Sequence, residues 1–150
     1  MRAAYKEALK AFAEDEVPVG CVIVKDDKII ARAHNRKEQK NCALSHAEIE
    51  CIRKAVRKLQ NWNLKGCTMY VTLEPCLMCT GALINSRIDR IIYACKDPKG
   101  GALVSNLKIR EVKGLNHYPL FDEGPMQEEC AKLLKDFFRN KRQKSATDNR

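Results

Sequence analysis

Short apolar runs alternate with amphipathic stretches along the chain, and this pattern predicts its secondary structure. Two apolar runs flank the turn pair Asp26-Asp27 and predict a hairpin at residues 17–24 and 28–34. Further strands are predicted at residues 68–73 and 90–96, with a short edge strand near residue 120. Apolar positions three and four residues apart predict helices at residues 2–14, 46–59, 76–86 and 126–141.

The order of these elements predicts the class of fold. Strands that follow one another through helices favour a parallel sheet with helices on both faces, and the hairpin adds one antiparallel pair. We therefore expect an α/β protein. Its architecture would be a three-layer α/β/α sandwich around a mixed, mainly parallel sheet of about five strands.

The length of 150 residues is typical of one domain. From residue 141 the sequence KRQKSATDNR has almost no apolar side chains. A segment of this composition cannot bury enough apolar surface to hold a fixed structure. We expect one folded domain over residues 1–142 and a basic, disordered tail over residues 143–150.

Composition and charge narrow the class of protein. The chain is 45% hydrophobic and 31% charged, which is typical of a water-soluble globular protein. It has no run of 18 apolar residues and no apolar secretory signal at its N-terminus, so we expect no membrane contact and a cytoplasmic location. The net charge of +9, of which residues 139–150 carry +4, indicates a polyanionic partner.

The chain has eight cysteines, and only one pair has the spacing of metal ligands. The other six stand among apolar or small residues, and we interpret them as packing residues. Cys76 and Cys79 are three residues apart at a predicted helix start, so their thiols share one face. A lone C-x-x-C is common, so this spacing alone leaves both a structural and a metal-binding interpretation open.

A histidine thirty residues earlier completes a candidate zinc site. His46 also lies at a predicted helix start, and the chain offers no second C-x-x-C and no H-x3-H. Three ligands, His46, Cys76 and Cys79, would leave one position of a tetrahedral zinc ion open, as in catalytic zinc sites.

Glu48 is a candidate proton carrier in this site. A carboxylate beside the open position can accept a proton from water and pass it to a substrate. The alternative is structural, because Ser45-His46-Ala47-Glu48 matches the S-x-x-E capping box of a helix N-terminus, with Ser45 as the N-cap. The joint occurrence of H-A-E and P-C-x-x-C favours the catalytic interpretation.

These motifs resemble those of the zinc-dependent cytidine and deoxycytidylate deaminase superfamily. Longer segments resemble the bacterial tRNA-specific adenosine deaminases, which convert the wobble adenosine of a tRNA anticodon to inosine. The resemblance covers roughly residues 2–142 and rests on EVPVGCVIV, HNR, HAEI, YVTLEPCLMCTGALINSRI, KDPKGG and EECAKLLKDFFR. It implies a cytidine-deaminase-like fold and hydrolytic deamination of adenosine by a zinc-activated water.

The resemblance also implies roles for single residues. His46, Cys76 and Cys79 would hold one Zn²⁺ per chain, and Glu48 would carry the proton. Asn35 and Asp97 match family residues that contact the target nucleoside and its ribose. For both of these residues a simple turn role remains the alternative.

The implied partners are the anticodon arm of a tRNA and a second copy of the chain in a homodimer. From the charge of the last helix we expect Arg139, Lys141 and Arg142 to contact the tRNA, with a solvated helix end as the alternative. Two other functions stay open. One is a deaminase of a free base or nucleotide, of the guanine or dCMP type; the other is a non-catalytic, zinc-stabilised RNA-binding module.

Overall fold

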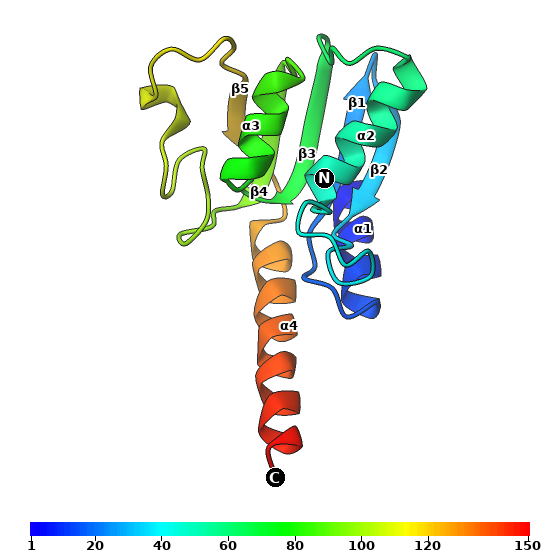
Figure 1. The fold of residues 1–150 in the computed structure, drawn as a ribbon, viewed down its shortest axis with the longest axis vertical. Coiled ribbons are helices and arrows are strands. Elements are labelled where there is room, and N and C mark those ends of the chain that lie inside the picture. Colours follow the sequence, from blue (N-terminus) through cyan, green and yellow to red (C-terminus); the bar gives the residue numbers. More distant parts are fainter.

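The computed structural model describes residues 1–150 and contains every element predicted from the pattern (Figure 1). The strands are β1 Gly20–Lys25, β2 Lys28–His34, β3 Cys67–Leu73, β4 Arg90–Cys95 and β5 Leu120–Glu123. The α-helices are α1 Arg2–Ala13, α2 Ala47–Leu59, α3 Leu77–Asn85 and α4 Gln127–Asp148. A short 3₁₀ helix, Ile109–Glu111, lies in the long connection before β5.

The five strands form one mixed sheet in the order β2-β1-β3-β4-β5. β1 pairs antiparallel with both of its neighbours, whereas β3, β4 and β5 pair in parallel. Four strands therefore point the same way and β1 alone is reversed. The prediction of a mixed sheet of about five strands with one hairpin is confirmed, whereas the antiparallel pairing of β1 with β3 was not predicted.

Helices cover both faces of the sheet, which confirms the three-layer architecture. α1 and α4 pack on one face, and α2 and α3 lie side by side on the other (Figure 1). The core between the layers is built from β-branched and small side chains of the central strands, such as Ile23, Val71 and Ile91. α2 and α3 both begin at the same end of the sheet, so the two helix N-termini meet there (Figure 1).

The backbone of α1 lies in direct contact with the backbone of β1. α1 buries its small residues Ala4, Ala8 and Ala11 together with Glu7. A Cβ atom at Gly20 of β1 would overlap the backbone of Ala4 and Ala8. Only glycine permits this backbone contact.

The C-terminal segment differs from the prediction. α4 continues to Asp148, so the expectation of a disordered tail is wrong for residues 143–148. The segment contains no Gly or Pro, and Lys, Arg, Gln and Ala favour helix without any tertiary contact. Ion pairs from Lys141 and Lys144 to Asp15 also fasten this part of α4 to the end of α1.

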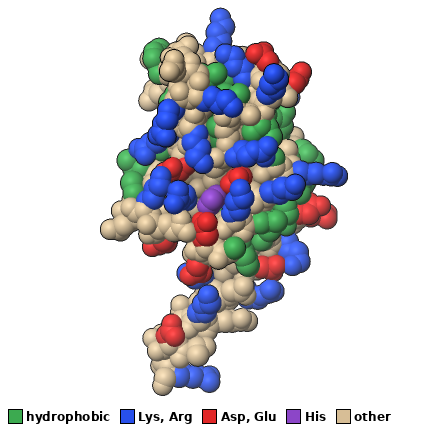
Figure 2. All heavy atoms as spheres, turned by 90° about the vertical axis from the view of Figure 1, so that its right-hand side faces the viewer, with side chains coloured by type: hydrophobic (Ala, Val, Ile, Leu, Met, Phe, Trp, Pro, Cys, Tyr) green, Lys and Arg blue, Asp and Glu red, His purple; other side chains and the backbone are tan.

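Positive charge is not confined to α4. Figure 2 shows Lys and Arg side chains spread over the face at the β2 edge of the sheet. The exposed basic residues of β2 and α2 include Arg32, Lys54, Arg57 and Lys58.

No helix is long and apolar enough to cross a bilayer. All eight cysteines are free thiols.

Candidate active site

The structure brings the three predicted metal ligands together where α2 and α3 begin. His46 is the N-cap residue of α2, Cys76 is the N-cap residue of α3, and Cys79 lies in the first turn of α3. The His46 Nδ1 atom is 3.6 Å from Cys76 Sγ and 3.5 Å from Cys79 Sγ. All three ligand atoms lie within 4.8 Å of one another.

Both helices begin one residue later than predicted. His46 and Cys76 have extended backbones, and neither helix start has a side-chain cap. The prediction that Ser45 caps α2 is therefore wrong. The capping box is not formed, so Glu48 has no capping role.

The charges of the cluster suit a divalent cation. The Cys79 thiol and the His46 ring lower the pKa of Cys76 to about 4. The Cys76 thiolate and burial in turn raise the pKa of Cys79 far above its ordinary value. The pair alone therefore holds one negative charge. A dication bound between the sulfurs would stabilise both thiolates, and two sulfurs with one imidazole are ligands that zinc prefers.

Glu48 lies beside this cluster at the buried start of α2. It is 4% exposed, and its charge is among the causes that raise the pKa of the Cys79 thiol. Burial raises the pKa of the Glu48 carboxyl, and the negative charge of Cys76 adds to this rise. A carboxyl group whose pKa is raised toward the pH of the solution can both accept and donate a proton.

A cavity of about 210 Å³ opens beside the cluster. Among its lining residues are five of the six residues predicted from the motifs, and they come from four separate segments: Asn35, His46, Glu48, Cys76 and Asp97. The sixth, Cys79, is fully buried behind them. The predicted ligands, proton carrier and nucleoside contacts therefore lie in or directly behind the wall of one cavity.

Asn35 and Asp97 line the cavity and also close turns. Asn35 Nδ2 donates to the carbonyl of Val17, and its Oδ1 accepts from Lys37 N. Asp97 Oδ1 accepts from the backbone N–H groups of Lys99 and Gly100. The structural alternative considered for each residue is thus realised, and it fixes both side chains at the cavity wall.

Sequence reasoning missed several lining residues. Glu74 is 2% exposed, and the apolar side chains of Val17, Val19 and Leu73 complete the wall. The signal for Glu74 was a lone carboxylate at the end of the apolar strand TMYVTL. The valines carried no local signal, because only the return of the chain after α1 places them here.

The three residues predicted to contact tRNA lie in different settings on α4. Arg139 pairs with Asp136 at 2.9 Å, and Lys141 pairs with Asp15 at 2.7 Å. Arg142 lines a second, more open hollow of about 660 Å³ with Lys99, Lys135 and Phe138. This hollow shares Asp97 with the cavity, so the two spaces adjoin.

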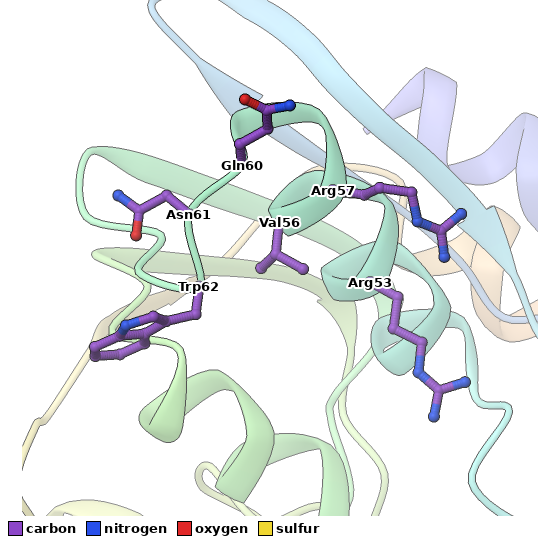
Figure 3. Close-up of a pocket in the computed structure, with 6 residues that line it drawn as sticks. All are labelled: Arg53, Val56, Arg57, Gln60, Asn61 and Trp62. Carbon is purple, nitrogen blue, oxygen red and sulfur yellow. The ribbon is translucent and has the colours of Figure 1, made fainter.

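Another hollow, of about 530 Å³, lies at the opposite end of α2 (Figure 3). Arg53 and Arg57 project side by side from the helix, and Trp62 stands on the segment that follows it (Figure 3). Its lining begins at Arg53, roughly 10 Å along the helix from His46, and shares no residue with the cavity. This hollow is therefore not part of the active site.

Comparison with known proteins identifies the class to which this fold and this cluster belong. Residues 1–142 match the MafB19-like deaminase family. The chain belongs more specifically to the tRNA-specific adenosine deaminases. It is 42% identical to the tRNA-specific adenosine deaminase of Bacillus subtilis (strain 168) over 144 residues, which cover 96% of this chain and 89% of that protein.

Solved structures agree with this assignment. One comes from a study of A-to-I editing by tRNA:A34 deaminases; it superimposes with a TM-score of 0.87 at 42% identity and covers 89% of this chain and 97% of that chain. A guanine deaminase from Bacillus subtilis is more distant, with a TM-score of 0.64 at 28% identity, covering 93% of this chain and 90% of the other. The fold is thus shared by deaminases of different substrates.

Proposed function

We propose that this protein deaminates adenosine to inosine at the wobble position of tRNA anticodons. The observation that carries the proposal is the single cavity lined by His46, Glu48, Cys76, Asn35 and Asp97. The relatives named for this reaction are similar over nearly the whole chain. Guanine deaminases share the fold at lower identity, which makes a free base the second candidate substrate.

The donor set of the cluster fits one zinc ion per chain, held by His46, Cys76 and Cys79. When bound, zinc would act as a Lewis acid that lowers the pKa of a water molecule to roughly 7. The thiolates of the two cysteines would neutralise the charge of the ion. Metal analysis of the purified protein checks this stoichiometry.

Glu48 is the catalytic acid and base in this proposal. Its carboxylate accepts a proton from the attacking water and delivers it to the adenine ring, while the oxygen bonds to C6. Glu48 then takes the proton of the new hydroxyl group on C6 and passes it to the amino group. The C6–N bond breaks as the C6 carbonyl forms, so water and adenosine give inosine and ammonia. The raised pKa of Glu48 suits both directions of proton transfer.

Asn35 and Asp97 would bind the target nucleoside from opposite walls of the cavity. Both side chains are held by turn hydrogen bonds, so they are already oriented before the substrate arrives. A base can enter an enclosed cavity only after it leaves its stack. Anticodon-loop bases do so at modest cost, which favours tRNA over double-stranded RNA.

The basic side chains of α4 would bind the phosphates of the anticodon arm. Arg142 contributes most in this proposal, because it lines the hollow next to the cavity. Lys141 and Arg139 are each paired with an acid and would contribute less. This arrangement would place the nucleotides that flank the target between α4 and the loop at Lys99.

A homodimer is the proposed assembly. Two large apolar side chains are exposed where α2 and α3 begin, on the face that these helices share: Leu44 at 51% and Leu77 at 63%. Burying such a face between two copies would stabilise a dimer. Light scattering should give about twice the chain mass of 17.1 kDa; an active monomer would contradict this assembly.

The proposed location is the cytoplasm, where tRNA substrates are found. Eight free thiols fit a reducing compartment.

An inosine assay tests the proposal directly. The substrates are a panel of tRNAs and their anticodon stem-loops, with free adenosine, cytidine and guanine as controls. Inosine should form at the wobble position and the free compounds should remain unchanged. Turnover of guanine instead would support the second candidate, and tRNA binding without any turnover would indicate a non-catalytic RNA-binding module.

A further inference from the structure

Glu74 is a buried carboxylate that neither the metal cluster nor the proton transfer uses. It is 2% exposed and directly follows β3. Its Oε2 atom accepts hydrogen bonds from the backbone N–H groups of Leu103, Val104 and Ser105, at 3.1, 2.9 and 3.1 Å. Its Oε1 atom accepts from Asp97 N at 3.2 Å and from the Ser105 hydroxyl. One side chain therefore satisfies five donors of one loop.

The rest of this loop, residues 97–105, also closes around the same point. The N–H of Glu74 donates to the carbonyl of Cys95 at 2.8 Å, and Ala102 N donates to the carbonyl of Pro75 at 2.9 Å. A Cβ atom at Gly101 would overlap the Glu74 carboxylate, so the loop backbone lies directly against it. The loop has no strand or helix of its own, and these bonds give it its shape.

This carboxylate stands between two parts of the active site. Asp97, at the first bond of the loop, lines the cavity, and Cys76, two residues after Glu74, is a metal ligand. We propose that Glu74 is a positioning residue: it holds the 97–105 loop so that Asp97 faces the target nucleoside at a fixed distance from the metal cluster. This inference rests on the proposed function, because it assigns Asp97 to the nucleoside.

The amide of glutamine cannot replace this carboxylate. Both oxygens of Glu74 face donors, so in Glu74→Gln the NH₂ group would point at N–H or O–H groups in either orientation. The Ser105 hydroxyl can rotate to accept from the new NH₂ group, but a backbone N–H cannot. In the orientation that loses fewest bonds, the bond from Asp97 N is therefore lost and the loop would shift. Asp97 contacts its ligand before and during the reaction alike, so a shifted loop should raise KM and leave kcat nearly unchanged.

The test combines steady-state kinetics on an anticodon stem-loop with zinc analysis of the same samples. Glu74→Gln should raise KM about tenfold, change kcat by about twofold or less, and keep the zinc content of the wild type. Asp97→Ala should raise KM as well. The double variant should be no worse than Asp97→Ala alone, because Glu74 acts through Asp97.

Two further variants keep the test decisive. Ser105→Ala removes one donor from the loop side and should raise KM about threefold, even if Glu74→Gln does not fold. Ile23→Val, in the core at β1, should lower the melting temperature without moving KM. This variant shows whether a loss of stability by itself changes KM.

Each remaining outcome overturns the inference. A lower melting temperature with an unchanged KM would make Glu74 purely structural, and a loss of zinc would assign it to the metal centre. Additive effects of Glu74→Gln and Asp97→Ala would show that Glu74 does not act through Asp97. If Asp97→Ala leaves KM unchanged while the wild type still forms inosine, this inference fails and the proposed reaction stands.

Discussion

The cavity beside His46 and the outer half of α4, residues 138–148, differ in where their charged groups lie. Around the cavity, Glu16, Glu48 and Glu74 are each at most 4% exposed. Glu16 and Glu74 accept backbone hydrogen bonds from the loops that form the walls. On α4 the side chains beyond Phe137 are largely in water, and their ion pairs lie at the surface.

The difference lies in what each kind of charge can do. A buried carboxylate must have donors around it, so it fixes the positions of its neighbours and its own pKa responds strongly to them. An exposed lysine or arginine keeps its water, and salt screens its attraction for a partner. The cavity can therefore supply chemistry and geometry, whereas outer α4 supplies an adjustable attraction for phosphates.

The largest effect should follow the loss of a metal ligand. In Cys79→Ala the donor set falls to two, so the zinc content should drop from about one per chain to near zero and deamination should fall below detection. Elemental analysis after dialysis measures the metal. Cys130→Ala, another buried cysteine, is the matched control and should keep both zinc and activity. Full zinc in Cys79→Ala would remove Cys79 from the ligand set.

Next in size is the loss of the proton carrier. Glu48→Ala should lower kcat by ~10²–10⁴ or more while the zinc content remains that of the wild type. Glu50→Ala is the control, since Glu50 lies on the same helix and pairs with Lys40 outside the cavity. A variant that keeps its rate but loses stability would return Glu48 to a structural role.

Outer α4 should give a smaller and salt-dependent effect. Neutralising Arg139, Lys141, Arg142 and Lys144 to glutamine should weaken tRNA binding, flatten its salt dependence and leave the rate at saturating tRNA nearly unchanged. Arg142→Gln alone should account for more of the loss than Arg139→Gln, because Arg142 adjoins the cavity. Unchanged affinity and slope would mean that this charge serves solubility only.

The smallest expected effects are on the free energy of unfolding and its pH dependence. They are seen by substituting one buried carboxylate, Glu7, and one exposed carboxylate, Asp15. Glu7 is 5% exposed; burial alone would raise its pKa, but hydrogen bonds from Lys10 and His34 hold the pKa below its ordinary value of 4.5. Glu7→Gln should cost about 1.5–3 kcal/mol at pH 7. Asp15→Asn, at the exposed pair with Lys141, should cost little and only at low salt.

Lowering the pH should remove the stability cost of Glu7→Gln. Because the pKa of Glu7 is depressed in the folded state, its stabilisation is fully present above the unfolded value of 4.5 and is lost as the pH falls through the folded pKa. Urea unfolding of wild type and Glu7→Gln at pH 7 and at successively lower pH should show the two converging. A constant difference at all pH values would show that Glu7 acts by packing alone.

The sequence predicted the strands and the proximity of His46, Cys76 and Cys79 well, for a physical reason. Alternating apolar runs are local, and β2 spans the predicted residues 28–34. The spacing of Cys76 and Cys79 is local too, and His46 was found because it lies at a helix start. Local patterns of this kind survive folding, because neighbouring residues share one element.

Features that depend on how distant segments meet were not predictable. The composition after residue 141 lacks the apolar stripe that tertiary packing needs, so the sequence pattern ends the last helix there. Helix propensity and the pairing of Lys141 with Asp15 extend it to Asp148. Glu74 and the loop around it form a wall only after β3 and β4 align in parallel. Glu74 and the loop that it contacts are far apart in the sequence, so no local pattern links them.

The length of α4 has a consequence for how the molecule exchanges its amide hydrogens. Phe137 is the last buried residue of the helix, and the eleven residues from there to Asp148 extend about 16 Å further. Their amides can open by fraying of the helix end, without any unfolding of the sheet. They should exchange quickly and independently of denaturant, whereas amides of β1 and β3 should wait for global unfolding. The molecule thus carries a helix whose two halves belong to different cooperative units.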